Sequence, residues 1–311
     1  MKNLNHVLPV AIAFMIIVSC SKESNNPLEL PVTSKYNAVE DFLTANEVKS
    51  QSFTFEGSTG GVFTAEQGTE IFIPAYSFAT ESGFPIAGNV TLEFKEIYKK
   101  SDMVLSAKPT IQWDGRPLES EGEFFLKATY NGDAVQLAPG ASIVVVPNTF
   151  GLPCDTNMEA FTAQMNPFSW SPATGASVVD SVFNRLFIGQ LLNPIDVGTW
   201  YNIDNVTVFD AYQQTTLALQ QNDSADLYGT QVFLVFDDIN TVIQVINTGK
   251  DFRYDFAPVG LNCMAVALGV KEGILYSSIV PITIAPNQTI AFTMNPALEE
   301  MLKGQLRLLD R

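Results

Sequence analysis

Alternating apolar and polar residues are the main pattern along much of the chain. In the segment NVTLEFKEI, Val90, Leu92 and Phe94 alternate with polar side chains. A period of two residues is typical of strands with one buried and one solvated face. Turn-forming residues such as Pro139-Gly140 separate these segments. The pattern predicts an all-β fold, with further strands at 69–75, 123–130, 142–147, 181–189, 230–236, 241–246, 251–256, 262–270, 274–284 and 288–295.

Helical spacing occurs at the two ends of this strand series. Val39, Phe42 and Leu43 lie at i, i+3 and i+4, which predicts a short helix over 38–47. A second helix is expected over 295–310, capped by Asn295 with proline at its first position. Its apolar residues should form a stripe that packs on the last domain: Leu298, Met301, Leu302 and Leu306.

Composition divides the strand series into two groups. Residues 149–177 are rich in Pro, Asn, Ser and Thr, which is typical of a linker or a long connection. We therefore expect a first β-sandwich at 38–148, a linker at 149–177, and a second β-sandwich with the C-terminal helix at 178–311.

The N-terminal residues form an apolar run that ends at a cysteine. The run from Val7 to Val18 is about a dozen residues, whereas a helix that spans a bilayer needs about 20. It therefore reads as the core of a signal peptide, residues 1–19. The ending Ile17-Val18-Ser19-Cys20 resembles the bacterial lipobox, in which cleavage precedes the cysteine and lipid is attached to its sulfur. The alternative is an ordinary export signal with a chance cysteine.

Lipidation of Cys20 would place the protein at the outer membrane, in either leaflet. Several acyl chains hold a protein to a bilayer far more firmly than one chain does. Residues 20–37 would then form the tether, which begins with the polar segment SKESNN.

Charge and histidine content narrow the classes of function. The whole chain has a net charge of −16 at pH 7, and loss of Lys2 with the signal peptide would make it one unit more negative. Such a surface repels nucleic acid phosphates, so no nucleic acid partner is expected. The one histidine, His6, lies in the signal peptide. The mature chain would therefore lack histidine-dependent catalytic sets and histidine metal sites, which favours a protein that is not an enzyme.

Part of the first strand group resembles a known sandwich. Gly60-Gly61, the motif I-x-I-P-A at 71–75 and the strand after Gly88 are similar to the ZU-five type domain of zona occludens proteins, ankyrins and netrin receptors. The fuller segment, about residues 50–148, resembles an N-terminal module of Bacteroidota lipoproteins with no assigned function. The segment 198–206 resembles a tryptophan-centred segment of their second module, although relatives often carry cysteine where Ile203 stands. These motifs specify a fold better than a function.

The segment WDGR is the first candidate ligand site. It places an aromatic ring, Trp113, beside Asp114 and Arg116. Aromatic faces flanked by polar groups bind sugars. The favoured alternative is a hairpin turn in which Asp114-Gly115 supplies the positive φ.

Trp200, Asn202 and Asp204 form the second candidate. Alternation would direct these three side chains to one face of a strand, where they could hold a hydroxylated ligand or calcium. The favoured alternative is a structural cluster, with the tryptophan packed at a domain junction and the polar groups bonded to nearby backbone.

Calcium and a disulfide are further alternatives. Asp237-Asp238 and the segment 222–226 carry oxygen ligands, but neither has the glycine and distal glutamate of an EF-hand loop. We therefore expect no cofactor, with calcium as the open alternative. Cys154 and Cys263 would be the only cysteines left besides Cys20, and their spacing leaves both a disulfide and free thiols open.

The sequence therefore favours a non-catalytic, lipid-anchored accessory or interaction subunit of an outer-membrane complex, with a protein partner in the envelope. A surface module that binds glycans or peptides is the alternative. A glycoside hydrolase with two carboxylates ranks last, because such enzymes work without histidine but need two carboxylates in a cleft.

Overall fold

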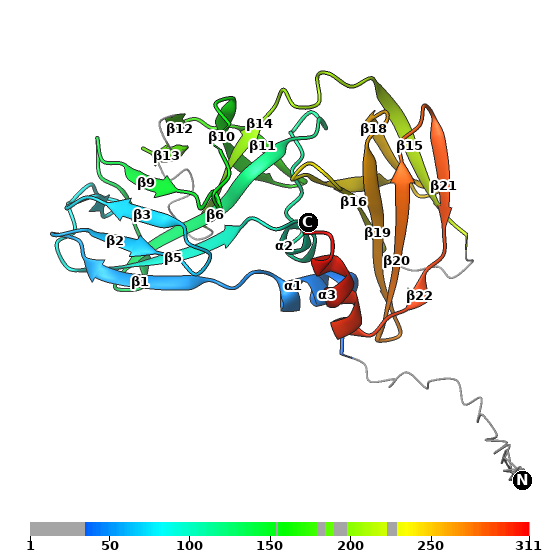
Figure 1. Cartoon of the computed structure of the whole chain (residues 1–311). Coiled ribbons are helices and arrows are strands. Elements are labelled where there is room, and N and C mark those ends of the chain that lie inside the picture. Colours follow the sequence, from blue (N-terminus) through cyan, green and yellow to red (C-terminus); the bar gives the residue numbers. More distant parts are fainter. Residues whose placement is uncertain (1–34, 154, 180–183, 190–197, 223–228, 311) are drawn as a thin grey trace, which may run out of the picture. The chain divides into compact units, whose positions relative to one another are not determined.

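The computed structural model describes residues 35–153, 155–179, 184–189, 198–222 and 229–310. Strands dominate this part of the chain, with one short helix near its N-terminal end and one near its C-terminal end (Figure 1). The predicted all-β class is confirmed. Among the described residues, no helix is both long enough and apolar enough to cross a membrane.

A seven-stranded sheet is the larger layer of a β-sandwich. Its strands follow the order β1-β5-β6-β14-β10-β11, with β7 paired to β6, and all neighbours are antiparallel. The strands are β1 (Gln51–Glu56), β5 (Asn89–Ile97), β6 (Glu119–Tyr130), β7 (Asp133–Ala134), β10 (Met158–Met165), β11 (Phe168–Pro172) and β14 (Thr199–Asn205).

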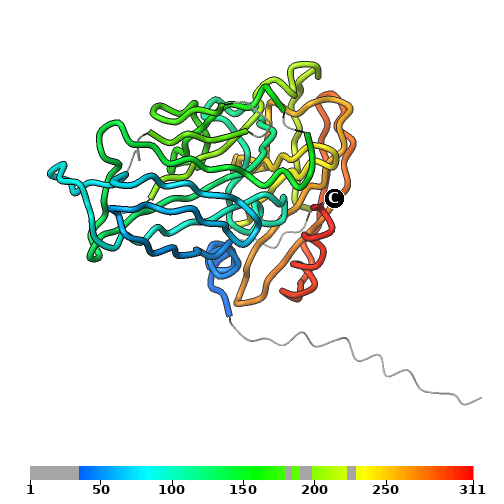
Figure 2. The backbone as a smooth tube through the Cα atoms, turned by 60° about the vertical axis from the view of Figure 1, so that its left-hand side comes forward, coloured from blue at the N-terminus to red at the C-terminus, as the bar shows by residue number. Residues whose placement is uncertain are grey.

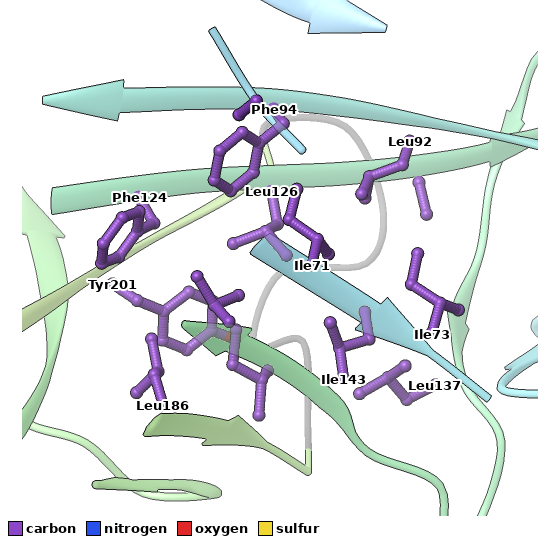
Figure 3. Close-up of a cluster of buried hydrophobic side chains, with 14 of the residues drawn as sticks. Ile71, Ile73, Leu92, Phe94, Phe124, Leu126, Leu137, Ile143, Leu186 and Tyr201 are labelled. Carbon is purple, nitrogen blue, oxygen red and sulfur yellow. The ribbon is translucent and has the colours of Figure 1, made fainter. Parts of the chain in front are cut away.

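A five-stranded sheet forms the facing layer, in the order β12-β13-β9-β3-β2, and a two-stranded sheet pairs β4 with β8. Apolar side chains from both layers fill the space between them, including Phe94, Leu126, Ile71 and Tyr201 (Figure 3). The alternating apolar residues Val90, Leu92 and Phe94 of β5 are buried in this core, as are Ile71 and Ile73 of β3. The strands are β2 (Gly61–Thr64), β3 (Glu70–Ile73), β4 (Phe78–Ala79), β8 (Gln136–Leu137), β9 (Ile143–Val146), β12 (Ala176–Val179) and β13 (Arg185–Ile188).

The last strands form an eight-stranded sheet in the order β21-β15-β18-β17-β16-β19-β20-β22. In the trace of Figure 2 these strands run from yellow-green to red. Side chains from both ends of this order, such as Leu219 and Ile282, share one core, so the sheet curves around it. The strands are β15 (Gln214–Gln221), β16 (Gln231–Phe236), β17 (Val242–Asn247), β18 (Phe252–Pro258), β19 (Asn262–Lys271), β20 (Ile274–Thr283), β21 (Gln288–Phe292) and β22 (Asn295–Pro296).

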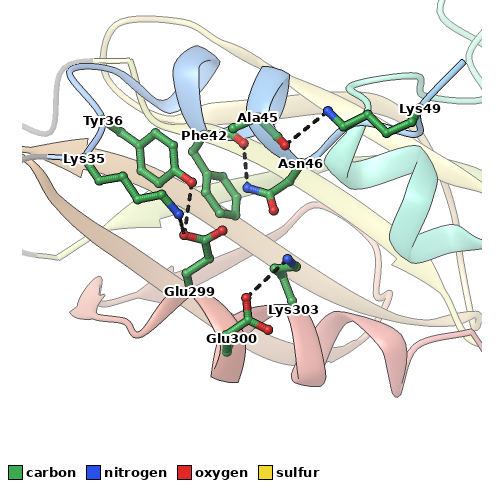
Figure 4. A network of polar contacts seen from close by, with 9 residues as sticks. All are labelled: Lys35, Tyr36, Phe42, Ala45, Asn46, Lys49, Glu299, Glu300 and Lys303. Carbon is green, nitrogen blue, oxygen red and sulfur yellow. Dashed lines mark hydrogen bonds and ion pairs between the residues drawn. The ribbon is translucent and has the colours of Figure 1, made fainter.

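A third apolar core joins the sandwich to the eight-stranded sheet, and we call it the junction core. It combines Trp170 and Trp200 of the sandwich with Phe233 of β16, and with buried residues of all three helices. The helices are α1 (Val39–Asn46), α2 (Lys100–Leu105) and α3 (Glu299–Arg307). Polar contacts add to this core, because Lys35 and the Tyr36 hydroxyl, just before α1, both bond the Glu299 carboxylate of α3 (Figure 4).

The predicted linker differs from the structure. Residues 149–177 contain β10, β11 and the start of β12, and β13 and β14 beyond them also pair with sandwich strands. Composition misled here because β10 and β11 have polar outward faces and turn on Asn166-Pro167, so the segment resembles a connection. The sandwich strands therefore extend to Asn205.

The C-terminal helix is also shorter than predicted. It begins at Glu299, and Asn295-Pro296 pairs with β20 as strand β22. Leu302 and Leu306 of the predicted stripe are buried, whereas Leu298 and Met301 are exposed. Pro296 lies in an edge strand of the sheet. An edge position tolerates a residue that has no backbone N–H.

Candidate functional site

A groove of about 730 Å³ lies between the sandwich and the eight-stranded sheet. Five segments line it: the start of β6, the loop around 148–158, the beginning of α2, the turn 237–240 and Asp310. The segments are far apart in the sequence, so only the tertiary fold brings these side chains together.

Hydrogen bonds fix the turn 237–240 onto the sandwich. Asn240 Nδ2 donates to the carbonyl oxygens of Ser120, at 2.7 Å, and Tyr98, at 3.1 Å. The Ser120 N–H donates in return to the Asn240 carbonyl at 3.0 Å. Thr241 Oγ1 donates to the Leu118 carbonyl at 2.7 Å in the same region. The turn 237–240 is therefore held to the sandwich by side-chain bonds to backbone carbonyls and by one bond between backbone groups.

The loop after β9 supplies an apolar edge. Asn148 anchors it, since its N–H donates to the Tyr98 hydroxyl at 2.8 Å and its Nδ2 donates to the Gln67 carbonyl at 2.7 Å. Phe150 lies edge-on against Tyr98, with ring centroids 5.2 Å apart. Phe150 and Leu152 are 59% and 71% exposed, so this edge presents apolar surface to solvent.

Both walls of the groove carry carboxylates. Glu119, Glu121 and Asp155 lie on the sandwich side, and Asp237, Asp238 and Asp310 lie on the other side. Burial raises the pKa of Glu119, and the nearby Asp155 raises it further. Burial also raises the pKa of Glu121, a shift that its bond from Asn184 partly offsets.

Some of these carboxylates have partners and some have none. Asp155 Oδ2 accepts from Asn205 Nδ2 at 2.6 Å, and Asp310 accepts two bonds from Ser101. Within the described ranges, no hydrogen bond or ion pair involves the carboxylates of Glu119, Asp237 or Asp238.

Lys99 and Lys100 are the basic residues that line the groove. The Lys100 ammonium donates to the carbonyl oxygens of Phe236, at 2.7 Å, and Asp237, at 2.8 Å. Burial lowers the pKa of Lys100, against the attraction of Asp237. The groove therefore keeps an excess of negative charge.

Two further carboxyl groups lie inside the seven-stranded sheet, next to the groove wall. Glu123 of β6 pairs with Asn202 of β14, and Asp204 pairs with Ser120, with a register shift that leaves Glu121 unpaired. Both carboxyl groups are fully buried, and burial raises the pKa of each well above its ordinary value. The charge of Asp204 raises the pKa of Glu123 further.

Hydrogen bonds offset only part of the free-energy cost of burying these two carboxyl groups. The Ser120 hydroxyl donates to Asn202 Oδ1 at 2.7 Å, and its interaction with Asp204 offsets only part of the effect of burial on the pKa of that carboxyl group. Among the described residues, neither oxygen of Glu123 has a hydrogen-bond partner. These two groups therefore favour the protonated, neutral form. No solvent reaches them, so a substrate in the groove would not touch them.

The predicted face of Trp200, Asn202 and Asp204 is buried in the same place. The Trp200 ring lies 5.4 Å from the Phe125 ring and 5.4 Å from the Lys108 ammonium. Trp200 is 7% exposed, and Asn202 and Asp204 are fully buried. This placement fits a structural cluster at the junction and leaves no open ligand face.

Trp113, Asp114 and Arg116 lie on a separate turn. Gly115 has a φ of +92°, and the Gln112 N–H donates to the Arg116 carbonyl at 2.8 Å, so the turn interpretation fits. Of the predicted pair Asp114-Gly115, only Gly115 has a positive φ. Arg116 Nε donates to Asp114 Oδ2 at 2.8 Å, and Trp113 is 66% exposed.

The remaining candidates give less. Cys20, Cys154, Asp223 and Asp226 lie outside the described residues. Cys263 has a free, buried thiol, and burial raises its pKa to about 12. Asp237 and Asp238 line the groove, but no cluster of three metal-ligating side chains occurs in the described part of the chain.

A scan against models of protein families finds no match to this chain. A search of curated proteins finds none either. The site is therefore interpreted from its geometry alone. Sequence reasoning missed the groove and Glu123, and the closest signal was the run of acids at 119, 121 and 123 that leads into the strand predicted at 123–130.

Proposed function

We propose that this chain is a non-catalytic binding subunit of the cell envelope, and that the groove is where it engages a protein partner. The groove itself carries the proposal. It combines an exposed apolar edge at Phe150 and Leu152 with three carboxylates, Glu119, Asp237 and Asp238, that no side chain or backbone group of the described residues bonds. Apolar contact with a few convergent polar groups is the usual composition of a binding site.

Rigidity favours binding at this place. The groove is held by the bonds of Asn240 across the junction and by the anchored Asn148. A site that is ordered before the partner arrives loses less conformational entropy on binding. A partner would therefore meet a preformed surface.

Two features favour binding over catalysis. Beyond the predicted signal peptide the chain has no histidine. The carboxyl pair of Glu123 and Asp204 is buried, so this pair cannot flank a sugar bond in an open cleft as a glycosidase pair must.

The anchor remains part of the proposal. The run that ends at Cys20 and the resemblance of residues 50–148 to a lipoprotein module both support an outer-membrane lipoprotein. Changing Cys20→Ala should move the protein from the membrane fraction to the soluble fraction. Full retention in the membrane fraction would contradict the anchor without touching the groove.

Site-specific crosslinking tests the groove. A photo-reactive residue at Leu152 should give one discrete crosslinked product in intact cells, and mass spectrometry should identify the partner segment. The same residue at Val62, which is 63% exposed on β2 and is not among the residues lining the groove, is the matched control. Equal products from both positions would contradict a specific site.

Trp113 supports glycan binding as a second candidate function. Its ring is exposed on a rigid turn beside a charged pair, as sugar platforms require. A glycan array probed with the parent protein and with Trp113→Ala tests this candidate function. If Trp113 is a sugar platform, the parent should bind glycans and the variant should not.

A further inference from the structure

We propose that the partner segment bound in the groove is a basic peptide in which lysine or arginine residues are interspersed with apolar residues. This inference rests on the proposed function and specifies the chemistry of the partner. It starts from the charge of the two walls. Among the residues that the structure describes, six with carboxylates and two lysines line the groove.

The free carboxylates lie on both walls. Glu119 is on the sandwich side, and Asp237 and Asp238 are on the turn of the other side. The Lys100 ammonium is attracted by both Asp237 and Asp238, but its single positive charge cannot neutralise the two carboxylates together. A ligand with several separated cationic groups could pair with both walls at once.

The spacing of the carboxylates argues against a single metal ion. No three metal-ligating side chains in the described ranges converge closely enough to hold one. Separated acids instead match the spaced ammonium or guanidinium groups of an extended chain.

The apolar edge of the groove indicates a second property of the ligand, namely apolar side chains. Phe150, Leu152 and Ile239 line the groove together with the acids. Small inorganic cations would leave this surface in water. A peptide with apolar side chains between its basic residues would cover it and gain the hydrophobic contribution.

Matched dye-labelled peptides test the inference by fluorescence anisotropy. A peptide of alternating lysine and leucine should bind the full-length protein. Peptides with glutamate in place of lysine should not bind, and peptides with serine in place of leucine should bind more weakly. Higher salt should weaken the lysine-leucine peptide because ions screen exposed charges.

Charge variants locate the binding. Glu119→Gln with Asp237→Asn should weaken the lysine-leucine peptide by about two- to thirtyfold, the range for two partly exposed ion pairs. Glu66→Gln with Asp133→Asn changes the net charge equally at exposed positions that are not among the groove residues, and should leave the affinity close to that of the parent. Equal losses in both double variants would assign the attraction to the general negative charge and overturn the inference.

Leu152→Ser provides a second test that spares the fold, because Leu152 is 71% exposed. It should weaken the lysine-leucine peptide and leave the lysine-serine peptide unchanged. A neutral or acidic segment crosslinked at Leu152 in cells would overturn this inference and leave the proposed function standing. Groove-dependent peptide binding without a cellular crosslink would support the preference of the groove for basic, apolar peptides and overturn the proposed function.

Discussion

Glu123 has a carboxyl group that is closed to solvent and that no hydrogen-bond donor among the described residues stabilises. Its side chain is fully buried, and its pKa is raised well above the ordinary value of about 4.3. In the pH range between these two values, the folded protein holds a proton that the unfolded chain releases. The free energy of unfolding therefore falls as pH rises through this range, by about 1.4 kcal/mol per pH unit for one carboxyl group.

Glu123→Gln should remove this dependence, because glutamine has the same shape and does not ionise. Near pH 4 the variant and the parent should be similarly stable. At pH 7 to 8 the variant should be the more stable protein, which denaturant titrations across pH would measure. Glu56→Gln, at an exposed position on β1, is the control and should show no such difference. Parallel pH curves for parent and Glu123→Gln would contradict the burial of a neutral carboxyl group.

Two tryptophans offer a direct comparison of buried and exposed rings. Trp200→Ala removes a ring that is 7% exposed and packs against Phe125, so it should lower the free energy of unfolding by about 3–5 kcal/mol. Trp113→Ala removes a ring that is 66% exposed and should stay within about ±0.5 kcal/mol. Thermal unfolding of both variants measures this. A tolerated Trp200→Ala would show that the ring is not part of the junction core.

At the scale of elements, helix α2 depends on a residue far along the chain. Asp310 Oδ1 accepts from the Ser101 N–H and its Oδ2 accepts from the Ser101 hydroxyl, each at 2.8 Å. A carboxylate at this end of a helix satisfies free N–H groups and favours the helix dipole.

Asp310→Ala should therefore lower the free energy of unfolding by about 1 kcal/mol, the usual effect of losing a cap. Hydrogen exchange at the backbone of α2 should become faster. Asp310→Asn keeps an acceptor and should cost less. Glu300→Ala, on the exposed face of α3, is the matched control and should have little effect. Unchanged exchange in Asp310→Ala would show that the helix is held by packing alone.

Elements were predictable from sequence where one strong local pattern decided them. The period-two pattern of β5 and the spacing of Val39, Phe42 and Leu43 both predicted their elements correctly. Residues 158–172 were missed because sheet pairing on both sides overrides a composition typical of loops. Similarly, a good cap sequence at Asn295 gives way to pairing with β20.

The candidate site was much less predictable. Alternation predicted one shared face for Trp200, Asn202 and Asp204, but it could not show that all three side chains are buried. The groove needs Glu119, Phe150 and Asp237 to meet, and no local pattern relates positions so far apart in the chain.

At the scale of the molecule, the β-sandwich and the eight-stranded sheet share buried surface. Strand β16 contributes Val232 and Leu234 to the core of the eight-stranded sheet and Phe233 to the junction core. Separation of the β-sandwich from the eight-stranded sheet would expose the apolar side chains of the junction core to water, which is unfavourable. We therefore expect them to unfold together.

Two reporters test this cooperativity in a chain that starts after Cys20 and carries Cys154→Ser. The fluorescence of the buried Trp170 and Trp200 follows the sandwich side of the junction core, and the reactivity of the Cys263 thiol follows the core of the eight-stranded sheet. Their denaturant midpoints should coincide. Two different denaturant midpoints would show that the β-sandwich and the eight-stranded sheet unfold as independent domains.

The contacts of α3 also set an order of events during folding. Glu299 bonds Lys35 and Tyr36, and Asp310 bonds Ser101, so the last described residues complete structure begun by the first. A chain emerging from a ribosome or an export channel from its N-terminal end can pair the early sandwich strands while α3 is still to come. The junction core stays open until that final segment arrives. Newly made chains therefore pass through a stage with apolar surface uncovered, and this is when a chaperone would be needed most.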